Sequence, residues 1–446
     1  MINLDNKIRL NKNNYFKFLL FFCFATCILS VSTDYDDLLL FKLEEIKFSN
    51  IINFTRQFSI IIIFFICFYK IIDLIKNKKL DLKKNIIFIL AIFYFLIQSV
   101  GLVKTNNSIE NITYITSSIT FILVTLLCNY YLKDFNDKKI LISILTVILS
   151  IVFLISFFKI FYPFISGERS LYGAIYSNTE FFLNKYAPRS SGMARTLVFI
   201  LIFLNLLFYN VLSKKRYISE ILKIFTIVII LNLQSRAVIG MTIIVFVFFY
   251  LLDRDFSLKN TVKYVLLYII IPLFILFFIN LIHSINFHKK STNGLKNYSL
   301  KENLITTNTI RKFDGTITSG RINDWNLIYE KFKSLNRTNK LFGYGAQGDR
   351  YSINQTASSG IFYALISSGI VGLIIYIFFT ILVFIKSIKL IYYNYSNYKI
   401  ILPVTLILIT MIRSIVESSY AVFGIDFIVF FTSILIINDI HYKIKK

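Results

Sequence analysis

The chain is poor in the residues that build metal sites and disulfide frameworks. It has only three histidines and four cysteines. No histidine has an acidic neighbour that would complete a ligand cluster, and every cysteine lies inside a long apolar stretch, where a thiol packs as a small apolar group. The sequence therefore predicts no disulfide framework, no metal and no cofactor. The residues are His283, His288, His441, Cys23, Cys27, Cys67 and Cys128.

Charged residues are also scarce, at 16% of the chain, whereas hydrophobic residues reach 56% and the mean hydropathy is +0.67. Such a composition excludes an ordinary soluble domain and is typical of polytopic membrane proteins. Apolar runs long enough to cross a bilayer recur from end to end, and about twelve spans are predicted. They cover 16–33, 57–75, 86–103, 112–132, 140–165, 194–212, 221–234, 237–252, 265–282, 359–385, 400–418 and 424–438.

The basic residues predict the orientation. A net charge of +25 does not indicate nucleic acid, because the lysines and arginines form short clusters beside apolar spans and no aromatic-interleaved domain carries a groove. With twelve spans these clusters share one side, which the positive-inside rule makes the cytoplasm, so both termini are predicted there. The first span also resembles a signal peptide. We expect it to be retained, because the basic clusters fall on one side of the membrane only when this span is counted. The clusters lie at 7–17, 76–84, 214–216 and 443–446.

This count predicts an all-α fold in three parts. Residues 1–282 hold the first nine spans and a smaller outer loop near 166–193. Residues 283–357 form a large extracytoplasmic loop, too long to be an idle connection. Residues 358–446 hold the last three spans. Within them Arg413 and Glu417 stand four residues apart, the spacing of an ion pair on one helix.

Within the large loop, apolar residues recur every three to four positions from Ile322 to Leu335, which predicts an amphipathic helix. Thr318 or Ser319 would cap it and place Arg321 in its first turn. A guanidinium at a helix N-terminus suits phosphate, although a solvated surface arginine is the alternative. The segment 343–348 matches G-x-G-x-x-G, but no βαβ unit surrounds it, so we interpret it as a tight turn.

Arg236 interrupts two apolar runs at the segment 233–240, LQSRAVIG. A guanidinium placed there costs a few kcal/mol on insertion scales, which predicts an anionic partner. Arg189, at the mouth of the sixth span, is a weaker third candidate or an interfacial anchor.

Four segments together resemble the O-antigen ligase and Wzy O-antigen polymerase superfamily. The segment 233–240 resembles its "S-R-G-A" arginine, and 319–325 (SGRINDW) its "S-G-R-x-x-x-W" stretch. The segment 341–345 (LFGYG) resembles its "G-x-G" turn, and 365–372 (LISSGIVG) its "L-x-x-x-G-x-x-G" entry into the next helix. Their order, the large outer loop and the number of spans also match.

The resemblance implies a metal-independent, inverting glycosyltransferase of the bacterial cytoplasmic membrane, with the large loop in the periplasm. Donor and acceptor would be oligosaccharides on undecaprenyl diphosphate, held in the lipid bilayer, and a chain-length regulator would be a further partner. Arg236 and Arg321 would grip the diphosphate as catalytic residues, with Arg189 as a further substrate-binding residue, because forked guanidinium donors bind phosphate oxygens bidentately.

One position departs from the pattern. Where the ligases carry His-Asn, this chain has Ser358 and Ser359. A hydroxyl does not act as a base near neutral pH without an activator, so proton removal would fall to another outer group. The candidates are Glu168, Glu180, His283 and Asp324. The departure favours a repeat-unit polymerase over the alternative, a ligase that transfers glycan to lipid A core.

A lipid-linked oligosaccharide flippase or other transporter is the alternative from another class. The two halves of the chain show no internal repeat, although many secondary transporters are built from repeats. A transporter also has no need of a basic outer loop of this length.

Overall fold

The computed structural model describes residues 4–30, 48–81, 83–101, 108–165, 190–233, 235–253, 262, 266–278, 321–353, 356–394 and 397–444. These residues are predominantly helical and contain no β-strand, which confirms the predicted all-α class. Residues 166–189 and 283–320 of the two predicted outer loops, 166–193 and 283–357, lie outside the described residues.

Five helical segments are long and apolar enough to cross a membrane. They are Phe58–Lys76, Ile112–Tyr131, Gly192–Lys214, Gly360–Asn394 and Tyr398–Val416. Shorter apolar helices occupy Tyr15–Leu29, Ile86–Val100, Ala237–Tyr250, Leu266–Phe278 and Ile425–Asn438. The chain is therefore suited to a lipid bilayer, while the count of about twelve spans stays a prediction.

The helices fall into two compact units. Unit 1 comprises Met1–Ser32, Leu39–Leu145 and Gly320–Lys446, and unit 2 comprises Thr33–Leu38 and Thr146–Ser319. Unit 1 holds α1 (Leu4–Leu29), α2 (Phe48–Lys76), α3 (Ile86–Val100), α4 (Ser108–Tyr131), the start of α5 (Phe135–Ile165), α14 (Arg321–Lys333), α15 (Arg337–Phe342), α16 (Gly348–Ile353), α17 (Gly360–Asn394), α18 (Tyr398–Val416), η3 (Ser419–Ala421) and α19 (Ile425–Ile444). Unit 2 holds the rest of α5, α8 (Ser190–Lys214), α9 (Arg216–Asn232), α10 (Arg236–Asp253) and η2 (Leu266–Ile270).

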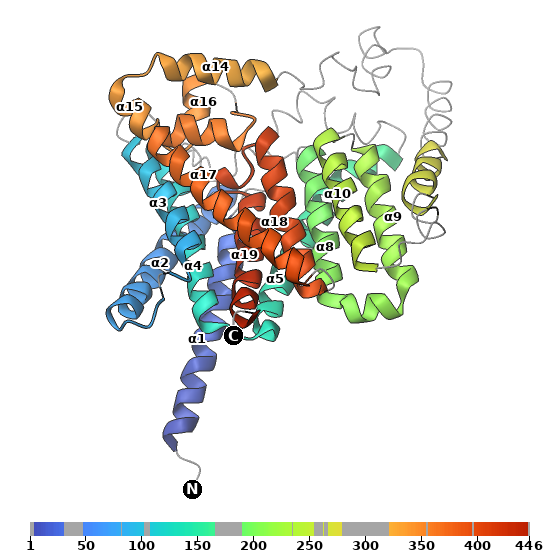
Figure 1. Ribbon diagram of the computed structural model, residues 1–446, viewed down its shortest axis with the longest axis horizontal. Coiled ribbons are helices and arrows are strands. Elements are labelled where there is room, and N and C mark those ends of the chain that lie inside the picture. The colour runs from blue at the N-terminus through green and yellow to red at the C-terminus, as the bar shows by residue number, and fades with distance from the viewer. Residues whose placement is uncertain are drawn as a thin grey trace. The chain divides into compact units, whose positions relative to one another are not determined.

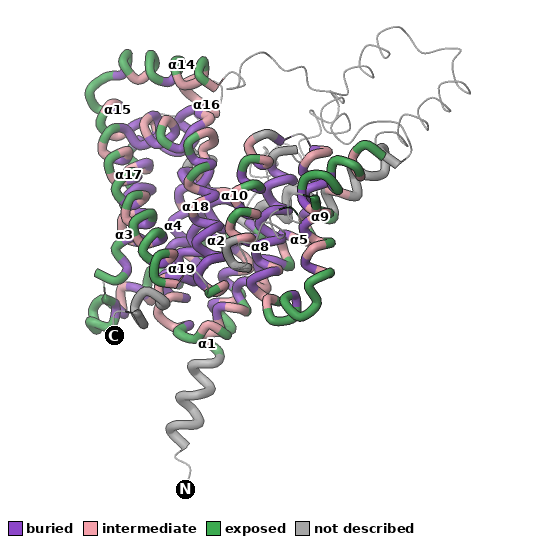
Figure 2. The backbone as a smooth tube through the Cα atoms, turned by 45° about the vertical axis from the view of Figure 1, so that its right-hand side comes forward, coloured by how far each residue is buried: buried purple, intermediate pink, exposed green. Residues whose placement is uncertain are grey.

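Unit 1 is a helical bundle with a helical cap at one end. α17 packs along α3 and α18, α18 packs along α19, and α4 lies against α1, α2, α3 and α19. Figure 1 shows the short helices α14, α15 and α16 at the end of the unit opposite the C-terminus, beside the start of α17. Figure 2 shows that buried residues continue from the bundle into α16 and the first turns of α17. The cap is thus packed on the bundle.

A break divides α17 after its first turns. A straight helix of its 35 residues would be about 52 Å long, well beyond the roughly 30 Å of a bilayer's hydrocarbon core. The chain leaves helical geometry at Gly369, which has φ +63°. A break in the hydrogen-bond ladder leaves nearby carbonyls without their intrahelical donors. The backbone nitrogens of Tyr344 and Gly345 donate to Ile366 O at 2.9 Å and Ser367 O at 2.8 Å, so the glycine turn satisfies these carbonyls.

Glycine is required on both sides of this contact. Gly343 has φ +74°, and a Cβ there would lie 2.4 Å from the carbonyl carbon of Ser367. A Cβ on Gly369 would lie 2.4 Å from the carbonyl oxygen of Leu341. Two of the segments named above, 341–345 and 365–372, therefore pack directly on each other. The interpretation of 343–348 as a tight turn agrees with this geometry.

Replacing Gly343 by alanine is expected to remove most folded protein from the membrane. The new methyl group would meet backbone atoms, which cannot rotate away, and the positive φ adds strain. Gly424→Ala is the matched control, because a Cβ there meets nothing within 4 Å. The measurement is the yield and elution profile of detergent-extracted protein. A Gly343→Ala variant that elutes like the wild type would show that the contact is not needed.

Candidate functional site

Helix α14 (Arg321–Lys333) has Arg321 in its first described turn, as predicted, whereas the predicted caps Thr318 and Ser319 lie outside the described residues. The buried face differs in part from the prediction. Ile328 is fully buried, whereas Ile322 and Tyr329 are 46% and 49% exposed. The helix instead packs through Trp325, Ile328 and Phe332, and Leu335, just beyond its end, is buried at the same spacing of three to four residues. The Trp325 ring stacks on Phe362 of α17, with centroids 5.6 Å apart.

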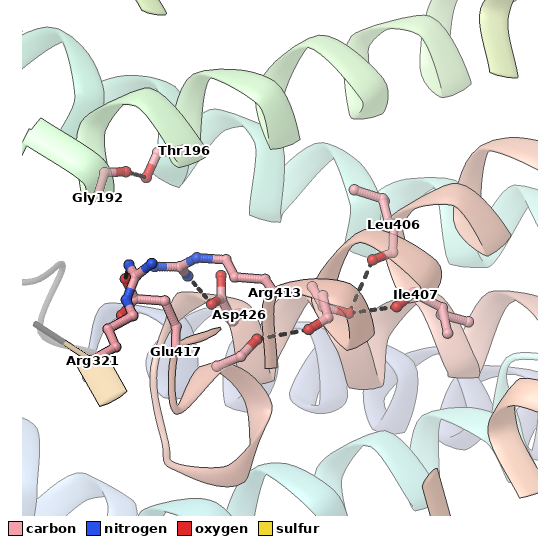
Figure 3. Close-up of polar contacts among 10 residues, drawn as sticks. Gly192, Thr196, Arg321, Leu406, Ile407, Arg413, Glu417 and Asp426 are labelled. Carbon is pink, nitrogen blue, oxygen red and sulfur yellow. Dashed lines mark hydrogen bonds and ion pairs between the residues drawn. The ribbon is translucent and has the colours of Figure 1, made fainter. Parts of the chain in front are cut away.

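Arg321 forms an ion pair with Glu417, at the end of α18. Its Nη2 donates to Glu417 Oε1 at 2.9 Å, and the side chains are 24% and 32% exposed (Figure 3). Each charge stands at the unfavourable end of its helix, the cation in the first turn of α14 and the anion at the C-cap of α18. At the start of α14 an anionic ligand would be favoured, because the helix N-terminus and the Arg321 guanidinium both attract negative charge.

The predicted pairing of Arg413 with Glu417 is wrong. Arg413 binds Asp426 through Nη1, and both side chains are buried, at 5% and 2% exposure. The reason is that α18 ends at Val416, and Glu417 is extended at φ −149°, ψ 157°. Its carboxylate thereby leaves the helix face that carries Arg413 and reaches Arg321. Figure 3 shows the Arg413 side chain extending toward Arg321, so two guanidiniums lie at this end of the bundle.

Ser358 occupies the position where the ligases carry histidine, and it forms a hydrogen bond with Asp324 of α14. Its hydroxyl donates to Asp324 Oδ2 at 2.9 Å. Trp325 Nε1 donates to the backbone oxygen of Ser358 at 3.2 Å. Ser358 has φ +48°, a left-handed conformation that is strained for a residue other than glycine. Two neighbouring side chains of α14 therefore hold this serine in place.

The loop before Ser358 is anchored by a buried carboxyl group. Asp349 is 3% exposed, and its Oδ2 accepts from the backbone nitrogen of Ala357 at 2.7 Å. Burial raises the pKa of the Asp349 carboxyl, while the bond to Ala357 opposes that shift. This anchor positions the residue that precedes Ser358.

The other predicted site residues lie in or beside unit 2. Arg236 begins α10, after α9 has ended at Asn232, so it stands between two apolar helices as expected. Its side chain lies outside the described residues, as do Arg189, Glu168, Glu180 and His283. Arg236 and Arg321 belong to different units, and their joint grip on one diphosphate stays a prediction.

Unit 2 contains a polar cluster that the sequence patterns did not indicate. Lys223 of α9 is 6% exposed, and its Nζ lies 3.3 Å from Glu220 Oε1 and 3.2 Å from the Tyr268 hydroxyl of η2. The ammonium also lies over the ring of Phe249, 5.0 Å from its centroid. In the sequence, only the presence of a lysine within an apolar run pointed to this cluster. Its charge is balanced inside the unit, which agrees with a structural role.

Comparisons of this chain with family models, with curated proteins and with solved structures find no match. The residues of unit 1 described above therefore carry the functional argument.

Proposed function

We propose that the protein is an extracytoplasmic glycosyltransferase that polymerises oligosaccharide repeat units carried on undecaprenyl diphosphate. The observation that carries this proposal is the partly exposed ion pair of Arg321 with Glu417 at the start of α14. Nη2 of Arg321, in the first turn of α14, binds a carboxylate, and phosphate oxygens can take the place of that carboxylate. The resemblance of 319–325 to the superfamily motif supports the same assignment.

The chemistry follows from the charge of the leaving group. When the bond between the anomeric carbon and the diphosphate breaks, negative charge develops on the diphosphate, and a preorganised guanidinium stabilises it. Glu417 must release Arg321 as the donor binds. Arg413 is neutralised by its buried partner Asp426, so it adds no free positive charge to the site. Arg236 and Arg189 are proposed as further contacts of the lipid-linked substrate.

The proposed location is the bacterial cytoplasmic membrane, with both termini in the cytoplasm. Support comes from three lysines of unit 1 that lie far from α14 and bind polar groups. Lys17 pairs with Asp137 at 2.7 Å, Lys138 donates to Leu435 O at 2.6 Å, and Lys386 bonds to Asn438. By the positive-inside rule these lysines face the cytoplasm and α14–α16 face outward. Ser358 in place of histidine favours the polymerase over the ligase.

The experiment is reconstitution of the purified protein in liposomes with an undecaprenyl-diphosphate-linked oligosaccharide. We expect longer lipid-linked glycans and one released undecaprenyl diphosphate for each new linkage, with the same rate in EDTA. An absence of elongation would contradict the proposal. Transfer to added lipid A core in place of elongation would indicate the ligase, and loss of the reaction in EDTA would contradict the metal-independent mechanism.

A further inference from the structure

The pairing of Asp324 with Ser358 points to the group that accepts the proton of the acceptor sugar. We propose that Asp324 is the general base of the glycosyl transfer and that Ser358 is its positioning residue. This inference rests on the proposed function. It assigns a role to a carboxylate that stands one helical turn after Arg321.

The geometry leaves one carboxylate oxygen for substrate. Ser358 donates to Oδ2 of Asp324, and Oδ1 has no hydrogen bond to the described residues. Both side chains are partly exposed, so the acceptor can reach them. The hydroxyl of Ser358 is a donor in this bond, which means that the serine orients the carboxylate and leaves the proton transfer to Asp324.

The site around the pair is rigid, as a positioned base requires. Trp325 holds the Ser358 carbonyl and stacks on Phe362, while Asp349 anchors Ala357. The left-handed φ of Ser358 persists because these contacts determine the loop. Strain of this kind is concentrated at functional sites.

The spacing along α14 places the proposed base and the proposed diphosphate ligand at one site. Residues i and i+3 share one helix face, so Arg321 and Asp324 are neighbours about 5 to 6 Å apart at Cβ. In an inverting displacement the acceptor attacks opposite the leaving group, so the base and the diphosphate ligand must flank the anomeric carbon. The acceptor O–H bond breaks, its oxygen forms the new glycosidic bond, and the diphosphate leaves with the electron pair of the broken bond. The proton passes to Asp324 and then to water.

The test compares Asp324→Asn with wild type in the liposome assay, with kcat and the affinity for undecaprenyl diphosphate as the two readouts. The asparagine keeps an oxygen that accepts from Ser358 but removes the base. We expect kcat to fall by about 100-fold or more. Binding of undecaprenyl diphosphate itself should be unchanged. Ser358→Ala should lower kcat by about threefold or less, because only a positioning hydrogen bond is removed.

Glu330→Gln is the matched control, since it removes an exposed carboxylate from the same helix. Asp324→Asn with at least half of the wild-type kcat would overturn the role of Asp324 and leave the polymerase standing. Loss of diphosphate binding in the same variant would also overturn it, because the carboxylate would then serve donor binding or folding. A wild-type protein that does not elongate glycan would overturn both proposals.

Discussion

Replacing Arg321 by lysine is expected to lower the rate of glycan transfer by about 100-fold, even though the positive charge is kept. Lysine lacks the planar fork that binds two phosphate oxygens together, and it cannot reproduce a bidentate contact. Removing one preorganised hydrogen-bond donor from a developing anion lowers the reaction rate by a factor of this order. The measurement is the initial rate of chain elongation in liposomes, with the chain length of surface polysaccharide as the cellular counterpart.

Arg337→Lys provides the matched control for this substitution. Arg337 also begins a helix of the cap, α15, but its side chain is exposed, and no ion pair links it to the described residues. Its replacement should leave elongation unchanged at equal expression. If Arg321→Lys elongates like Arg337→Lys, the Arg321–Glu417 pair is structural and the proposed diphosphate contact is wrong.

Replacing Asp426 by alanine is expected to lower the free energy of unfolding by about 3–5 kcal/mol. The substitution leaves the Arg413 guanidinium buried without its counter-charge, and breaking a buried pair in this way is strongly destabilising. Thermal unfolding of the detergent-solubilised protein measures the effect. An Arg413→Met, Asp426→Leu double variant should recover most of the stability, because no unpaired charge remains.

The exposed pair of Lys333 with Glu330 is the control for this prediction. Its side chains are 54% and 69% exposed, and Glu330→Ala should produce no measurable change. An Asp426→Ala protein that unfolds at the wild-type temperature would show that the Arg413 charge is compensated elsewhere.

Local patterns predicted the parts of the fold that depend on local physics. The apolar runs predicted the helix positions, and the periodicity of 322–335 predicted α14 with Arg321 in its first turn. The burial of Ile328 in place of Ile322 depends on which face of α14 meets α17, and a periodicity alone does not determine that face. The spacing of Arg413 and Glu417 assumed one continuous helix, but the helix ends between them.

The sequence predicted individual residues of the candidate site but not the partners that they contact. Arg321 and Asp324 could be selected because a guanidinium and a carboxylate lie in the first turn of a predicted helix in a predicted outer loop. Their partners Glu417 and Ser358 lie 96 and 34 residues away in sequence, and long-range contacts of this kind leave no local pattern. Asp426 had one signal, a charge in an apolar run, which indicates a buried partner without naming it.

The contact between the glycine turn and the broken start of α17 has a consequence for domain exchange. The turn at 343–345 supplies the donors for carbonyls of Ile366 and Ser367, and Gly369 supplies the room for Leu341. A chimaera that exchanges the cap for that of another chain at the first residue of α17 would separate these partners. The smallest unit that carries its own hydrogen-bond partners therefore extends past Gly369, into a helix that is long and apolar enough to cross a membrane.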